Sequence, residues 1–204
     1  KGPVAALDAS AATVGRAVVV SGLTVIVALA GLLVTGLAVF ASLALGTMVV
    51  GKRSAAPAVG DPAISTDTPT LRSTGGDLKA LSTARKPDRA LYETSVAEAL
   101  AARKAFVVSF ATPQFCQTRT CAPVVDVVSA VRRQPSSKGV VFIHVEVYED
   151  NDPAKGVNRW LDAWRLPTEP FTFVVDRRGR VSAKLEGAFS ARELEAAVAK
   201  VKTR

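Results

Sequence analysis

Hydrophobic residues dominate the first quarter of the chain. No charged residue occurs from position 17 to position 51, and the stretch AVVVSGLTVIVALAGLLVTGLAVF is 24 residues long. A helix needs about 20 apolar residues to cross a bilayer, and a globular helix of this length would show a polar face. Residues 1–51 are therefore predicted to span a membrane, with residues 17–50 in contact with lipid. Glycines within the run leave open one long helix or one helix and part of a second.

The pattern changes abruptly at residue 52. Residues 52–87 contain four prolines, the pair Gly75-Gly76 and many Ser, Thr and Ala residues, without apolar periodicity. A segment of this composition buries too little apolar surface to offset its chain entropy. The sequence therefore predicts a flexible linker over residues 52–87.

Residues 88–204 have the alternating pattern of an α/β domain. Ser95 with Glu98, and Ser190 with Glu193, match capping boxes that open helices. The runs AFVVSFA, VVFIHVEVY and FTFVVD are apolar and rich in β-branched residues, which favours buried strands. A turn at Gly179 leads to a fourth strand over residues 181–185, and two more helices are expected at residues 123–133 and within 151–164. This order predicts a central mixed sheet flanked by helices.

Charge is concentrated after the apolar run. The chain carries 26 Lys and Arg residues against 18 Asp and Glu residues, and only three of these charges precede residue 52. The surplus of bases is interpreted as a solubilising surface, although attraction to anionic lipid or to an acidic partner is also open. Aromatic residues are not interleaved with the bases, so a nucleic-acid partner is not expected.

The two cysteines, Cys116 and Cys121, are the main candidates for chemistry. Together with the single histidine, His144, they are too few for a Cys/His metal site, so neither a metal nor another cofactor is predicted. Positions five apart in a helix rise about 7.5 Å and point in different directions, whereas a disulfide needs Cα atoms within about 7 Å. If the two cysteines pair, Cys116 must lie in a loop. Pro123 suits a first helical turn, which places Cys121 at or just before the helix start.

Two further segments carry a resemblance to thioredoxins. The segment FVVSFATPQFCQTRTCAPVV resembles the strand, cysteine pair and helix of that family, and PFTFVVDRRGRV resembles the cis-proline and hairpin of its TlpA/ResA-like envelope members. The resemblance covers residues 88–204 and implies a thioredoxin-like fold. It implies that Pro170 is a cis-proline beside the substrate groove, that Cys116 is the nucleophile and that Cys121 resolves. The reverse roles of the two cysteines stay open, because Cys121 is expected closer to the helix start. Four residues separate the cysteines instead of the family's two, and Glu169, which would face them, disfavours a thiolate when ionised.

The apolar segment has a resemblance of its own. The stretch ATVGRAVVVSGLTVIVALAGLLV resembles a transmembrane helix of MMPL-type transporters of the RND superfamily. That resemblance implies a membrane anchor with Arg16 inside the cell and, if the chain crosses the membrane once, a C-terminal domain outside the cytoplasm. Residues 17–51 contain no ionisable group, so they cannot relay protons by themselves.

These observations favour a thiol–disulfide oxidoreductase held at a bacterial cell membrane and acting on the thiols or disulfides of a protein substrate. Two alternatives are a non-catalytic binding module with a structural disulfide, which would use the groove beside Pro170, and a transporter-derived membrane fragment. Free thiols also remain open.

Overall fold

The computed structural model describes residues 55–116 and 120–202, and the predicted membrane segment, residues 1–51, lies outside them. The helices and strands of the described chain are α3 (Val96–Ala101), β1 (Phe106–Phe110), α4 (Cys121–Arg132), β2 (Val141–Val145), α5 (Arg159–Ala163), β3 (Phe171–Val175), β4 (Val181–Glu186) and α6 (Ala191–Lys202). Short 3₁₀ helices occur at η1 (Arg89–Tyr92), η2 (Pro135–Ser137), η3 (Glu149–Asn151) and η4 (Pro153–Lys155).

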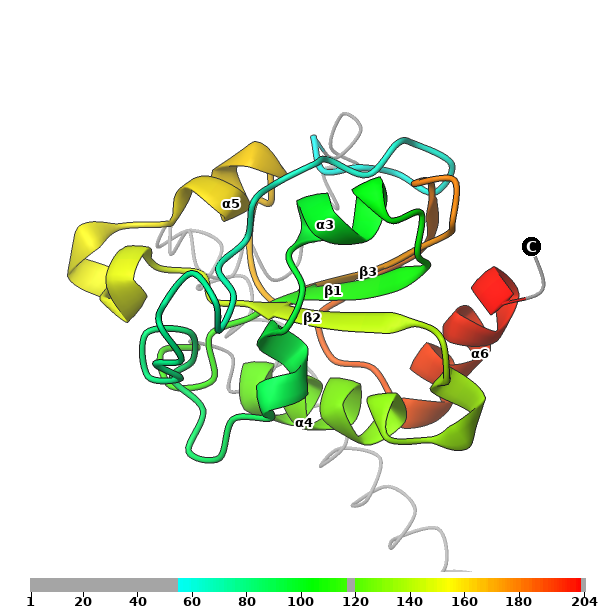
Figure 1. Ribbon diagram of the computed structural model, residues 1–204. Coiled ribbons are helices and arrows are strands. Elements are labelled where there is room, and N and C mark those ends of the chain that lie inside the picture. Colours follow the sequence, from blue (N-terminus) through cyan, green and yellow to red (C-terminus); the bar gives the residue numbers. More distant parts are fainter. Residues whose placement is uncertain (1–54, 117–119, 203–204) are drawn as a thin grey trace, which may run out of the picture. The chain divides into compact units, whose positions relative to one another are not determined.

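The strands form one mixed sheet in the order β2-β1-β3-β4 (Figure 1). Strand β1 runs parallel to β2, with Phe106 opposite Val141, and antiparallel to β3, with Phe106 opposite Val175. Strands β3 and β4 form an antiparallel hairpin. A parallel βαβ unit followed by a hairpin and a last helix is the arrangement of a thioredoxin-like fold, as the sequence predicted.

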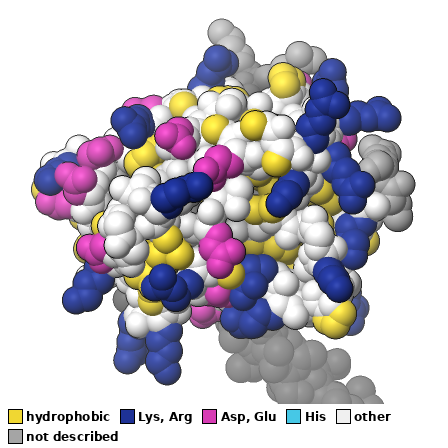
Figure 2. All heavy atoms as spheres, in the orientation of Figure 1, with side chains coloured by type: hydrophobic (Ala, Val, Ile, Leu, Met, Phe, Trp, Pro, Cys, Tyr) yellow, Lys and Arg dark blue, Asp and Glu magenta, His cyan; other side chains and the backbone are white. Residues whose placement is uncertain are grey.

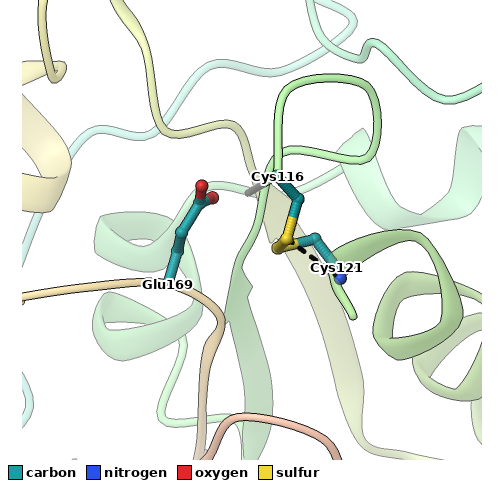
Figure 3. A group of neighbouring side chains, drawn as sticks. All are labelled: Cys116, Cys121 and Glu169. Carbon is teal, nitrogen blue, oxygen red and sulfur yellow. Dashed lines mark hydrogen bonds between the residues drawn. A yellow bond between two sulfur atoms is a disulfide. The ribbon is translucent and has the colours of Figure 1, made fainter. Parts of the chain in front are cut away.

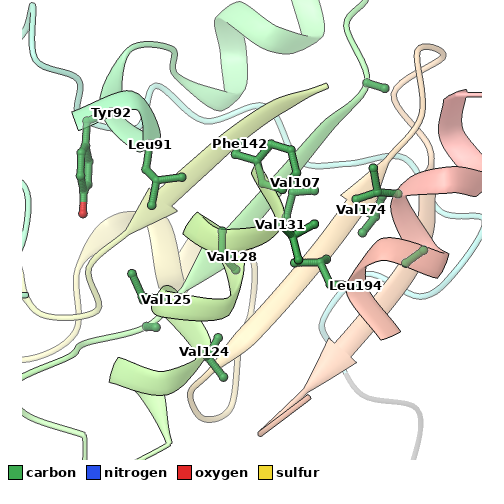
Figure 4. Close-up of a cluster of buried hydrophobic side chains, with 14 of the residues drawn as sticks. Leu91, Tyr92, Val107, Val124, Val125, Val128, Val131, Phe142, Val174 and Leu194 are labelled. Atoms are coloured by element: carbon green, nitrogen blue, oxygen red, sulfur yellow. The ribbon is translucent and has the colours of Figure 1, made fainter. Parts of the chain in front are cut away.

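Helices cover both faces of the sheet, which explains why the central strands are apolar at nearly every position. On one face, Val107, Phe142 and Val174 from three strands contact the buried side of α4 and α6 (Figure 4). Val124 and Val128 of α4 are fully or almost fully buried in this cluster. This packing fixes the position of α4 relative to the end of β1.

The opposite face is lined largely by aromatic residues and is covered by α3 and α5 (Figure 1). The ring of Trp164 lies 5.2 Å from the ring of Phe110 and 4.9 Å from that of Phe173, measured between centroids. Each of these three side chains is completely buried. Rings at these separations contribute stabilisation beyond their buried area.

Both predicted capping boxes are confirmed. The hydroxyl of Ser95 accepts a hydrogen bond from the backbone N–H of Glu98. In return, the carboxylate of Glu98 accepts a hydrogen bond from the backbone N–H of Ser95. Ser190 and Glu193 make the same reciprocal pair before α6. Each pair satisfies amide groups that a helix start would otherwise leave without partners.

The expected flexible linker needs correction from residue 55 onward. Residues 55–87 belong to the same compact unit as the rest of the domain. Pro62 forms a bridge with Arg180 beside the β3–β4 turn, and the backbone N–H of Leu71 donates to Tyr92. Ala56 and Leu81 are buried in the two core clusters. The segment is held by scattered backbone hydrogen bonds and single apolar anchors, which leave no periodic pattern in the sequence.

The charges are unevenly distributed over the face shown in Figure 2. Acidic side chains gather at the end where the loop with η3 and η4 lies, and Lys and Arg side chains are numerous toward α6. Within residues 55–116 and 120–202, no helix has the length and apolar character needed to cross a membrane.

Replacement of Leu81 by Ala tests whether residues 55–87 are part of the folded unit. Leu81 is 2% exposed in the cluster beneath α4, so L81A should lower the free energy of unfolding by about 2–4 kcal/mol, measured by urea denaturation. The control V59A changes a residue of the same segment that is 63% exposed. It should change the free energy of unfolding by less than about 0.5 kcal/mol. Equal small effects of both variants would mean that the segment is a loose tether.

Candidate active site around the cysteine pair

Cys116 and Cys121 form a disulfide with Cα atoms 5.9 Å apart. Cys116 lies in the loop that follows β1, and Cys121 is the first residue of α4. The predicted geometry, with one cysteine in a loop and the other at a helix start, is therefore confirmed.

The two cysteines differ in exposure. Cys121 is completely buried, whereas Cys116 is partly exposed. The backbone N–H of Cys121 donates to Sγ of Cys116 at 3.3 Å (Figure 3). After reduction, an amide at the N-terminus of a twelve-residue helix would face the sulfur of Cys116. Such a position favours the thiolate over the thiol.

Glu169 and Pro170 lie beside the disulfide, on the loop before β3. The peptide bond between them is cis, as the resemblance implied. The carboxylate of Glu169 and the two sulfur atoms all lie within 4.8 Å of one another (Figure 3). The backbone N–H of Thr112, at the start of the loop after β1, donates to Oε2 of Glu169 at 3.1 Å. The loop before β3 and the loop after β1 thus bring the carboxyl group to the sulfurs.

Burial of the side chain, together with the smaller effect of the negative charge of Glu146, raises the pKa of Glu169 to about 7, against the lowering effect of the Thr112 hydrogen bond. Near neutral pH this carboxyl group therefore changes between acid and base forms. A carboxyl group tuned in this way next to a thiol can accept or return a proton. While protonated, it also carries no charge that would disfavour a thiolate.

The same three side chains are also a group of potential metal ligands. In the disulfide form, neither Cys116 nor Cys121 is a thiolate, the species that binds metals. The described arrangement therefore supports exchange of electrons between sulfur atoms more directly than metal binding.

No protein-family model and no curated protein matches the chain. Among solved structures, the chain is similar to a thioredoxin-family thiol:disulfide interchange protein from Chlorobium tepidum, with 19% identity and a TM-score of 0.43 over 72% of this chain and 99% of that one. It is also similar to a putative thiol:disulfide interchange protein DsbE from Chlorobium tepidum, with 16% identity and a TM-score of 0.44 over 70% and 99%. StoA from Bacillus subtilis gives 15% identity and a TM-score of 0.37 over 46% and 81%.

Identities and TM-scores this low do not establish a family. The assignment of the fold rests on the strand order and connections.

Two residues near the site, Thr83 and Glu146, were not predicted as site residues; Glu146 has the sequence context of a solvated loop acid, yet it is buried. Both the backbone N–H and the hydroxyl of Thr83 donate to Oε1 of Glu146, at 2.6 and 2.9 Å. The same hydroxyl accepts the backbone N–H of Gln114, in the cysteine loop, at 3.1 Å. Thr83 thus joins the end of β2 to the cysteine loop. It was overlooked because it lies in the segment that composition marks as a linker.

Glu146 is 5% exposed, and its Oε2 is buried without a hydrogen-bond partner in the described chain. A buried carboxylate that is only half satisfied is costly, which makes its bonds to Thr83 important for this corner of the fold. Its charge is also one cause of the raised pKa of Glu169.

His144 has a structural role in this arrangement. It is 1% exposed on β2, with Nδ1 at 2.7 Å from the hydroxyl of Tyr92 and Nε2 at 2.9 Å from the carbonyl oxygen of Ala111. Burial lowers the pKa of His144 from its usual value. Both ring nitrogens have hydrogen-bond partners within the protein, so His144 is a structural histidine of the core.

Glu169 should make the oxidised protein less stable as the pH rises. Its pKa is about 7 when folded and 4.5 as a free side chain, so the folded state holds the proton more tightly. The resulting stabilisation is complete below pH 4.5 and is lost as the pH rises through 7. Between pH 5 and pH 8, the free energy of unfolding of the wild type should therefore fall by about 1–2 kcal/mol more than that of Glu169→Gln. The difference is smaller than the full pKa shift would give, because solvent screens a half-buried carboxyl group.

Urea unfolding of both oxidised proteins at several pH values measures this difference. His144 acts in the opposite direction, since its lowered pKa contributes stability that is lost as the pH falls through its usual value of 6.5, but it is common to both proteins. Glu186→Gln, at the exposed end of β4, is the control and should follow the wild type. Parallel pH curves for wild type and E169Q would contradict the raised pKa.

Proposed function

We propose that this chain is a thiol–disulfide exchange protein in which Cys116 and Cys121 carry the reacting electrons. The observation that carries the proposal is a partly exposed cysteine whose sulfur accepts a hydrogen bond from an amide at a helix N-terminus, next to a carboxyl group of raised pKa. A purely structural disulfide requires neither feature.

The difference in exposure assigns the two cysteine roles. In the reduced protein, the Cys116 thiolate attacks one sulfur of a substrate disulfide, forming a mixed disulfide and releasing the other substrate sulfur as a thiolate. Cys121 then attacks Sγ of Cys116, which restores the intramolecular disulfide and releases the second substrate sulfur. Two electrons pass from the protein dithiol to the substrate, and the reverse sequence oxidises a substrate dithiol.

Glu169 would serve the second step. A buried Cys121 thiol must lose its proton before it attacks, and the Glu169 carboxylate lies close enough to the sulfurs to accept that proton. With a pKa of about 7, the carboxyl group exists in both forms near neutral pH, so it can return the proton in the reverse direction. Pro170 and Glu169 border the side from which substrate reaches Cys116.

The proposal includes a membrane tether formed by residues 17–50 and a domain outside the cytoplasm of a bacterial cell. The uncharged run over residues 17–51 supports the tether. The disulfide between Cys116 and Cys121 supports the location, because disulfides persist mainly in oxidising compartments. The substrate is proposed to be a protein.

Single-cysteine variants test the assignment of roles. Reduced Cys121→Ser keeps the accessible sulfur and lacks the resolving one, so it should accumulate a mixed disulfide with insulin. This adduct is measured by non-reducing electrophoresis and mass spectrometry.

The matched variant Cys116→Ser retains only the buried Cys121 and should form the adduct at least about tenfold more slowly. Faster adduct formation by C116S would reverse the assignment. The absence of an adduct with both variants would contradict exchange by this pair.

A further inference from the structure

A cavity of about 730 Å³ lies beside the cysteine loop, on the side formed by α4 and residues 83–86. One wall is formed by residues 83–86, and the other by Ala122, Val125 and Asp126 of α4. Pro113 and Gln114 close the end next to β1. None of these residues belongs to the groove beside Pro170 that the resemblance implied.

The position of this cavity connects it to the reacting sulfurs. Ala122 directly follows Cys121, and Gln114 precedes Cys116 by two positions. A chain segment bound in the cavity would therefore lie along the same loop and helix start that present the disulfide. A volume of several hundred Å³ is enough to receive a few side chains of an extended segment.

Hydrogen bonds hold the outer wall in place. Thr83 donates twice to Glu146 at the end of β2 and accepts from the backbone N–H of Gln114. The backbone N–H of Ala84 donates to the hydroxyl of Ser82. The cavity is therefore formed before a substrate arrives, which reduces the entropy lost on binding.

The lining combines an apolar floor with a basic rim. Ala84, Pro113, Ala122 and Val125 contribute the apolar surface. Arg85 and Lys86 are exposed at the rim and face a single acid, Asp126. In the described chain neither base forms an ion pair, so both are available to a ligand. A cavity with this rim favours segments that carry negative charge.

We propose that this cavity binds the segment of a protein substrate that flanks its reacting cysteine, and that Arg85 and Lys86 select segments rich in Asp and Glu. This inference rests on the proposed exchange activity and adds the chemical class of its substrate. Residues 83–86, which lie outside every helix and strand, would then take part in substrate choice.

Two synthetic peptides test the selection. Both contain the same internal disulfide, and the cysteines are flanked by three Glu residues in one and by three Lys residues in the other. The rate of their reduction by the reduced 204-residue chain is followed at 50 mM salt by thiol trapping and mass spectrometry. The wild type should reduce the acidic peptide roughly 3–10-fold faster, as expected for two exposed ion pairs. This preference should decline at 500 mM salt, because such pairs are screened.

The variant R85E/K86E should reverse the preference. The matched control R177E/R178E changes the net charge by the same amount, in the exposed β3–β4 turn. This control should keep the preference for the acidic peptide. The inference would be overturned if R85E/K86E kept the wild-type preference for the acidic peptide. It would also be overturned if both double variants lost this preference equally.

Reduction of the small neutral 2-hydroxyethyl disulfide separates this inference from the proposed function. A normal rate with this compound, without a peptide preference, contradicts the selection alone. The absence of reaction with this compound contradicts the exchange activity and, with it, the selection.

Discussion

The packing of α4 against the sheet is the constraint on which the reactive part of the molecule depends. Val124, Val128 and Val131 of this helix are buried against β1, β2 and α6, so its axis and its first residue have fixed positions. That first residue is Cys121. The same packing therefore buries one sulfur, aims a backbone amide at the other and forms one wall of the adjacent cavity. Loss of valine packing would disturb all three together.

A second constraint is the cost of burying carboxyl groups near the disulfide. Glu169 is half-buried beside the sulfurs with one amide partner, and Glu146 is buried with two hydrogen bonds from Thr83. The charge of Glu146 adds to the upward pKa shift of Glu169, so the more deeply buried acid acts on the carboxyl group beside the sulfurs. Thr83 donates two hydrogen bonds to one oxygen of the deeper acid, and these bonds hold residues 83–86 at the rim of the cavity. Stability and chemistry are thus linked through one threonine.

Much of this arrangement was predictable from local sequence patterns, for definable reasons. The strands are continuous apolar runs because both faces of the sheet are covered, and the two capping boxes mark helix starts through reciprocal hydrogen bonds. The spacing of Cys116 and Cys121 excluded a shared regular helix for a bonded pair, and Cys116 indeed lies in the loop before α4.

The remainder depends on contacts between distant residues. Residues 55–87 have the composition of a linker, yet they pack through irregular backbone hydrogen bonds and isolated anchors such as Leu81. The bond between Thr83 and Glu146 joins positions 63 residues apart, and no local pattern reports such a pairing. The value of the Glu169 pKa likewise depends on burial by several loops.

The reduction potential of the Cys116–Cys121 pair is the most direct measurement of the central claim. It is obtained by equilibrating the 204-residue chain in glutathione buffers and trapping free thiols. Exchange predicts a potential within the range of about −120 to −270 mV that known exchange proteins occupy. A potential below about −300 mV would contradict this account, because it would mark a bond that persists as a structural disulfide in a binding module.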